Sequence, residues 1–126
     1  MRGPDSKTVV VVEDDASMSQ AMERILRLGG LAPVTFASAE EASGSHAVET
    51  AACLIIDLQL PGLNGFALRD RLAAAGVLAP VIFISAFDEP EARAQALAAG
   101  AQFLTKPFSG RALLDAIRKS APVNAK

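Results

Sequence analysis

An aspartate at the end of an apolar run is the residue of this sequence best placed to do chemistry. Residues 54–56 are leucine and isoleucine, and such a run predicts a short strand buried on both faces, as in a parallel sheet. Asp57 ends the run, and the Leu-Pro-Gly of residues 60–62 turns the chain. A charge in this place lies at the carboxyl edge of the sheet, where open α/β sheets bind their ligands. For one isolated strand, the alternative is an aspartate that caps the loop after it.

Polar side chains also stand at the ends of three other predicted strands. These strands are residues 8–12, 80–85 and 101–104, each of them mainly apolar. Right-handed crossovers place the carboxyl ends of parallel strands at the same edge, so these side chains should meet Asp57. They are Glu13, Asp14 and Asp15 after the first strand, Ser85 at the end of the fourth and Lys106 after the fifth.

This set of side chains is suited to a magnesium ion and an anion. Carboxylates held together repel one another and raise one another's pKa values unless a cation lies between them. Glu13, Asp14 and Asp57 would supply the hard oxygen ligands that Mg²⁺ prefers. Lys106 would supply a fixed positive charge for an anion beside the metal. We leave Asp15 out of the metal ligands, because an acid at this place is more typical of a helix N-cap.

The elements that would position these residues alternate along the chain. This alternation, with short links, predicts the α/β class, with a single doubly wound five-stranded parallel sheet and five helices on its two faces. Strands are expected at residues 8–12, 32–36, 54–57, 80–85 and 101–104. The helices are expected around Met18, Met22, Ile25 and Leu26, over residues 39–48, 65–75 and 89–99, and after Ser109 with Leu113, Leu114 and Ile117 inward.

Two of the expected helices are weak in different ways. Residues 39–48 contain Ser-Gly-Ser-His at 43–46 and almost no apolar stripe, so this helix should be the least stable element. Residues 89–99 are rich in alanine, with Leu97 the one large aliphatic side chain and Asp88 the expected N-cap. That helix should be well formed but loosely held to the sheet.

Composition limits the classes of function. The 126 residues are 51% hydrophobic, enough for one globular domain. The net charge of −2 gives no support for a nucleic-acid or membrane surface, and no apolar run approaches the roughly 20 residues of a membrane span. A single cysteine, Cys53, allows no internal disulfide, and one Cys with one His argues against zinc. We expect a cytoplasmic protein with a flexible tail over residues 1–7, a domain over 8–120 and a C-terminal tail or linker over 121–126.

Several short motifs together give the chain a family resemblance. They are Glu13-Asp14, Asp57, Ser85-Ala86 and Lys106-Pro107-Phe108, each at a strand end. With these motifs in this order, residues 8–119 resemble the receiver domain of two-component response regulators. The resemblance implies the flavodoxin-like strand order 2-1-3-4-5. It also implies a cis peptide between Lys106 and Pro107, in a turn that aims the lysine back at the pocket.

The resemblance implies a role for each residue of the site. Asp57 would take a phosphoryl group from the phosphohistidine of a sensor histidine kinase or a histidine phosphotransfer protein, in a reaction that requires Mg²⁺. The metal ligands would be Asp57 itself, Asp14 directly, Glu13 through a water and the main-chain carbonyl of Gln59. Lys106 would pair with the phosphoryl oxygens, the Ser85 hydroxyl would donate to them, and Phe103 would be an aromatic switch.

The expected function is therefore a phosphoacceptor signalling domain. It would not be an enzyme, since it would catalyse only its own phosphoryl transfer and dephosphorylation. The phosphorylated form would present a face to a downstream effector domain or protein, with no direct binding of nucleic acid or membrane. A dimer that forms on phosphorylation is left open.

Other interpretations stay open at this stage. Lys106 could be a surface lysine, Ser85 an ordinary strand-end hydroxyl and Phe103 a core residue. A degenerate receiver would act only as an interaction module, although the full acidic set argues against it. An aspartyl-nucleophile phosphatase would usually carry a second aspartate where Gln59 stands.

Overall fold

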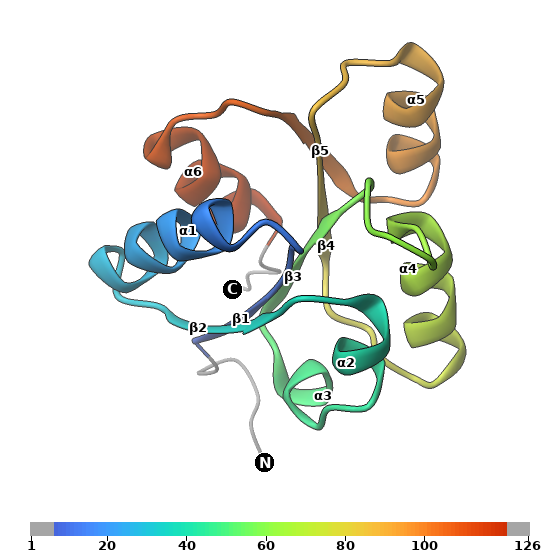
Figure 1. Cartoon of the computed structure of the whole chain (residues 1–126), viewed down its shortest axis with the longest axis horizontal. Helices are drawn as coiled ribbons and strands as arrows, with labels where there is room; N and C mark the ends of the chain where they lie inside the picture. The colour runs from blue at the N-terminus through green and yellow to red at the C-terminus, as the bar shows by residue number, and fades with distance from the viewer. Residues whose placement is uncertain (1–6, 121–126) are drawn as a thin grey trace.

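Five parallel strands form the centre of the computed structural model, which describes residues 7–120 (Figure 1). Their order across the sheet is β2-β1-β3-β4-β5, which confirms the predicted order. The expected tails lie outside the described residues, except for Lys7. The strands are β1 Thr8–Val12, β2 Ala32–Phe36, β3 Cys53–Asp57, β4 Val81–Ser85 and β5 Gln102–Thr105.

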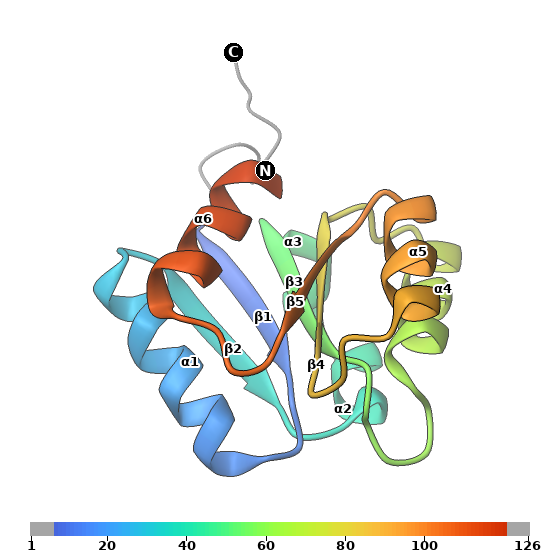
Figure 2. The same ribbon diagram turned by 90° about the horizontal axis from the view of Figure 1, so that it is seen from above.

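Six helices cover the sheet within the described residues, where five were predicted. None of the six is long and apolar enough to cross a membrane. Two helices, α1 and α6, lie on one face, and the other four lie on the opposite face (Figure 2). The helices are α1 Ala16–Leu28, α2 Ala39–Ser43, α3 Ala47–Thr50, α4 Gly65–Ala74, α5 Pro90–Ala98 and α6 Gly110–Ser120.

The additional helix arises because the predicted helix over residues 39–48 is broken into α2 and α3. Gly44 is the C-cap of α2, and Ser45 Oγ accepts the main-chain N–H of Ala47 at the start of α3. Serine and glycine favour such turns over a helix interior, so the continuous helix was a wrong prediction. The side chains that α2 and α3 bury are few and mostly small: Ala39, Ala42 and Val48.

Two predicted helix caps are present. The Asp15 carboxylate accepts the main-chain N–H groups of Ser17 and Met18 at 2.9 and 3.2 Å, which begins α1. Ser109 Oγ accepts the N–H of Ala112 at 3.0 Å and begins α6. Asp15 is thus a helix N-cap, which is the reason it was left out of the predicted metal ligands.

The predicted cap of α5 was wrong. Glu89 is the N-cap residue and makes no side-chain bond to the helix. The Asp88 carboxylate instead accepts from the guanidinium of Arg93, with Nη2 at 2.9 Å and Nε at 3.2 Å. A carboxylate bonds a guanidinium more strongly than a neutral main-chain N–H, which explains the choice of partner.

Strands β3 and β4 are buried along their whole length, as expected for strands with helices on both faces. Successive side chains of a strand point to opposite faces, so the sheet separates two cores. One core contains Val9, Val11, Cys53, Ile55, Ile82 and Ile84 together with Met22 and Leu26 of α1 and Leu113 and Ile117 of α6. The other contains Val10, Val12, Leu54, Ile56, Val81 and Phe83 together with Leu68 and Leu72 of α4 and Ala96 of α5.

The strand register determines which polar residues meet at the carboxyl edge. The pairing of β1 with β3 brings Glu13, the first residue after β1, level with Asp57. The pairing of β3 with β4 places Ser85 one residue beyond Asp57. Lys106 follows β5, and its main-chain N–H donates to the Ser85 carbonyl at 2.7 Å. The sheet alone therefore brings these four residues to one place.

Candidate functional site

Three carboxylates gather at the carboxyl edge of the sheet. Glu13, Asp14 and Asp57 each offer an oxygen, and these oxygens lie within 4.8 Å of one another. Glu13 and Asp57 are each only 2% exposed, whereas Asp14 faces solvent. Three acids at this spacing, one of them open to water, match the hard oxygen donors and retained waters of a magnesium site.

The ammonium group of Lys106 lies between two of these acids. Its Nζ is 2.9 Å from Glu13 Oε1, and it donates a hydrogen bond of 3.2 Å to Asp57 Oδ2. The peptide between Lys106 and Pro107 is cis, as predicted. The lysine side chain is 18% exposed, so its charge acts in a partly desolvated setting where electrostatic attraction is stronger than in water.

Glu13 Oε1 shows that the acidic site is not fully satisfied by protein groups. Among the described residues, the Lys106 ammonium at 2.9 Å is the partner of this buried oxygen, and no further group is recorded as donating to it. Its partner oxygen Oε2 accepts the main-chain N–H of Asp15 at 3.1 Å. A buried carboxylate oxygen with unused capacity is the donor that a cation would take.

The charges of this cluster shift two pKa values. Burial raises the pKa of Glu13 to about 7, and the neighbouring Asp57 adds to the rise, while Lys106 opposes it. Burial alone would lower the pKa of Lys106, but its contacts with Glu13 and Asp57 outweigh this and raise it. Lys106 is therefore held as a cation, and Glu13 is the acid whose charge depends on conditions near neutrality.

Gln59 joins Asp57 to Ser85, a connection that the sequence analysis missed. The main-chain N–H of Gln59 donates to Asp57 Oδ1 at 2.9 Å. Its side-chain Nε2 donates to Ser85 Oγ at 2.9 Å, and its Oε1 accepts the N–H of Ala86 at 3.0 Å. The sequence feature that could have predicted this connection is the Gln59 carboxamide itself. It can donate and accept at once, and it stands two residues after Asp57 at the same edge of the sheet. The metal-binding role expected for the Gln59 carbonyl stays a prediction.

Phe103 is buried on β5, and Arg93 lies over its ring. Arg93 is a second residue whose role the sequence analysis missed. The ring is 8% exposed, and the guanidinium carbon of Arg93 lies 4.7 Å from its centroid. Arg93 Nη2 also donates to Thr105 Oγ1 at 3.3 Å, in addition to its bonds with Asp88. Arg93 thus ties α5, the loop before it and β5 together over the ring.

Residues 9–118 match the sequence profile of the family described as the response regulator receiver domain. The chain belongs to this family. Among curated relatives, this receiver domain is 39% identical to Nodulation protein W of Bradyrhizobium diazoefficiens over 110 residues, which are 86% of this chain and 48% of that protein. It is 32% identical to the transcriptional regulatory protein TdiR of Thauera aromatica, over 95% of this chain and 53% of that protein.

The receiver domain also superimposes on solved structures. A response regulator receiver protein from Burkholderia phymatum is 40% identical, with a TM-score of 0.72 over 94% of this chain and all of that one. The receiver domain spans about half the length of the first curated relatives, whose remaining residues have no counterpart in it. Residues 9–118 are thus a receiver domain of the kind found in two-component response regulators.

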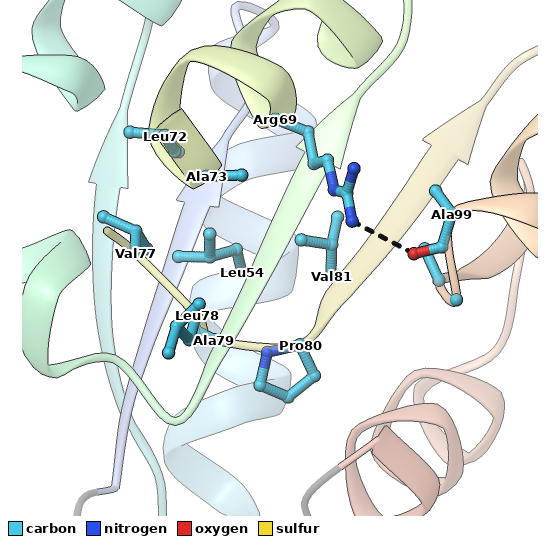
Figure 3. A pocket seen from close by; sticks show the side chains of 12 residues that line it. Leu54, Arg69, Leu72, Ala73, Val77, Leu78, Ala79, Pro80, Val81 and Ala99 are labelled. Atoms are coloured by element: carbon cyan, nitrogen blue, oxygen red, sulfur yellow. Dashed lines mark hydrogen bonds between the residues drawn. The ribbon is translucent and has the colours of Figure 1, made fainter. Parts of the chain in front are cut away.

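A hollow of this receiver domain lies at the opposite, amino edge of the sheet (Figure 3). It is lined mainly by apolar side chains, including Leu54, Leu72 and Val81, and Arg69 is the charged residue among those that line it. The Arg69 Nη2 group donates to the Ala99 carbonyl at 3.1 Å, which ties α4 to the end of α5. The acids and the lysine described above are all at the other edge, so the candidate site is there.

Proposed function

We propose that this receiver domain accepts a phosphoryl group on Asp57 from a phosphohistidine. The observation that carries the proposal is the position of Asp57 Oδ2, 3.2 Å from the Lys106 ammonium and beside two further acids. A carboxylate oxygen so placed is a nucleophile with a cation next to it for the incoming negative charge. Phosphoryl transfer depends mainly on such positioning and charge neutralisation.

Glu13, Asp14 and Asp57 would hold a magnesium ion in this site. The buried Glu13 Oε1, whose partner is the Lys106 ammonium, and the solvent-facing Asp14 support this assignment, because Mg²⁺ takes few protein oxygens and keeps several waters. When bound, the ion would neutralise charge on the carboxylates and the phosphoryl oxygens. The main-chain carbonyl of Gln59 is the fourth ligand that we propose.

The proposed reaction exchanges one phosphorus bond for another. A carboxylate oxygen of Asp57 bonds to phosphorus while the bond between phosphorus and the donor imidazole nitrogen breaks. The electron pair of that bond stays on the imidazole, which takes up a proton from water. Lys106, already held by Glu13 and Asp57, would turn its ammonium toward the phosphoryl oxygens.

The output of the reaction would pass through Ser85 and Phe103. A phosphoryl group changes the fold only through contacts that differ between the two states, and a bond from the Ser85 hydroxyl would be such a contact. Ser85 is the last residue of β4, directly before the loop to α5, and Phe103 lies on the neighbouring strand. We therefore propose that partners recognise the face made by α5, β5 and α6.

The partners themselves are part of the proposal. The donor would be a sensor histidine kinase or a histidine phosphotransfer protein, and the recipient a downstream effector domain or protein. TdiR is described as a transcriptional regulatory protein, which supports an effector beyond a receiver in that relative. The cytoplasmic location and a dimer that forms on phosphorylation stay predictions.

Intact mass spectrometry tests the proposal. Incubation with acetyl phosphate and Mg²⁺ should add one phosphoryl group to the wild-type chain. The Asp57→Asn variant and wild type with excess chelator should show almost none. Asp70→Asn is the matched control, because the Asp70 side chain is 76% exposed and lies away from the cluster. Undiminished labelling of Asp57→Asn would refute the assignment, and no labelling of wild type would favour a degenerate receiver.

A further inference from the structure

The carboxamide of Gln59 donates to the hydroxyl on which the proposed output depends. Its Nε2 group donates to Ser85 Oγ at 2.9 Å, and the main-chain N–H of Phe87 donates to the same oxygen at 3.0 Å. A serine hydroxyl has one donor and two acceptor positions, so both acceptor positions are in use. Among the described residues, Ser85 Oγ has no hydrogen bond with Asp57.

The same carboxamide also holds the first residue of the loop that leads to α5. Gln59 Oε1 accepts the N–H of Ala86 at 3.0 Å. Gln59 is itself fixed by the bond from its main-chain N–H to Asp57 Oδ1 at 2.9 Å. Gln59 therefore contacts the acceptor carboxylate through its main chain, and the Ser85 hydroxyl and the Ala86 N–H through its side chain.

We propose that Gln59 is a positioning residue that holds Ser85 and Ala86 in the unphosphorylated arrangement. The bonds from Gln59 Nε2 and the Phe87 N–H leave the Ser85 O–H free to donate, so Gln59 constrains where Oγ lies and not its capacity to donate. A move of Oγ toward a phosphoryl group on Asp57 would lengthen or break the bond from the Gln59 amide. Gln59 therefore opposes the phosphorylated state and sets how readily the site takes up an anion. This inference rests on the proposed function, because it assumes that the Ser85 hydroxyl contacts the phosphoryl group.

The expected size follows from the bonds that are released. Solvent-exposed hydrogen bonds between neutral groups are individually modest, and Gln59 is exposed. Removal of the carboxamide should therefore tighten binding of a phosphoryl analogue by about three- to tenfold. The opposite sign is expected if the carboxamide instead aims Ser85 at the phosphoryl position.

Beryllofluoride titrations with saturating Mg²⁺ measure this effect, followed by amide NMR because the chain has no Trp or Tyr. Gln59→Met keeps the length of the side chain and removes its hydrogen bonds, so it should bind about three- to tenfold more tightly than wild type. Gln95→Met, on the exposed surface of α5, is the matched control and should bind as wild type does. In metal-free protein, the Ala86 amide should exchange faster in Gln59→Met.

The same substitution made in a Ser85→Ala protein separates the positioning role of Gln59 from a general structural role. In Ser85→Ala the oxygen that Gln59 holds is absent, so adding Gln59→Met should give less than half of the gain seen in wild type. Equal or weaker binding by Gln59→Met, an undiminished gain in Ser85→Ala or unchanged exchange at Ala86 would overturn the inference while leaving the proposed function intact. Failure of wild type to bind beryllofluoride would overturn the proposed function and this inference with it.

Discussion

Glu13 is an acid that the fold buries before any cation arrives. Its side chain is 1% exposed, and burial raises its pKa from the ordinary 4.5 to about 7, with a further rise from Asp57. A carboxyl that binds its proton more tightly when folded stabilises the fold at low pH. That contribution is lost as the pH rises from about 4.5 through about 7.

Urea unfolding without divalent cations should show this loss. The free energy of unfolding of wild type should fall, relative to Glu13→Gln, between about pH 5 and about pH 8, because the glutamine has no proton to lose. Glu91→Gln, exposed at the start of α5, is the control and should follow wild type. Far-ultraviolet circular dichroism measures the transition. Parallel pH profiles for wild type and Glu13→Gln would contradict the burial argument.

The residues of the acidic site could be predicted because strand ends are readable in the sequence. Asp57 and Glu13 each follow an apolar run, and parallel topology then brings them together. The roles of the Gln59 and Arg93 side chains could not be predicted in the same way. Their partners depend on side-chain conformations across 26 and 12 residues of chain, which no periodic pattern encodes.

At the scale of elements, we expect α2 and α3 to be the least stable part of residues 7–120. They have five and four residues, and helices this short are marginal without tertiary packing. These two helices bury little apolar surface, because their buried side chains are Ala39, Ala42 and Val48. Amide hydrogen exchange should therefore be fast over residues 39–50 and slow in the middle of α1. Equal protection in the two regions would sink this prediction.

A substitution of Gly44 should stabilise the segment of α2 and α3 and so tests its low stability from the opposite side. Its φ is −92°, which alanine adopts readily, and an added Cβ would lie 3.7 Å from the nearest atom. Gly44→Ala should slow exchange over residues 39–50 by reducing the entropy of the open chain, worth about 0.4–1 kcal/mol. Unchanged exchange in this variant would mean that the opening is limited by packing alone.

The sequence predicted where the helices and strands lie better than it predicted how α5 packs against the sheet. Leu97 is the one large aliphatic side chain of α5, yet it is 65% exposed, and Ala96 is the buried residue instead. Helix periodicity in an alanine-rich stretch is weak, so it could not show which side faces the sheet. Arg93 holds α5 to β5 through its contacts with Phe103 and Thr105, which the composition of the helix did not suggest.

At the scale of the whole molecule, the proposed signal would travel away from the acids toward α5. The connection runs from Ser85 through the loop at Asp88 to Arg93 and the ring of Phe103. Beryllofluoride with Mg²⁺ should therefore shift amide resonances across residues 86–106 in wild type. In Ser85→Ala these changes should be much reduced.

Ser17→Ala, exposed on α1, controls for the loss of a hydroxyl elsewhere and should respond as wild type does. Changes that stay near Glu13 and Asp57 in wild type would mean that this face does not carry the signal. Changes of full size in Ser85→Ala would assign the coupling to another residue.

The strand order has a consequence for how such a domain can be recombined. The first three strands, all before residue 58, occupy one side of the sheet as β2-β1-β3, and the last two occupy the other as β4-β5. A crossover between two homologous chains just after Asp57 therefore cuts a single strand pairing, β3 with β4. Each parental fragment keeps its own half of the sheet, the first with the acids and the second with Ser85, Phe103 and Lys106. The three carboxylates and the proposed output residues would in this way come from different parents, with the Gln59 carbonyl supplied by the second fragment.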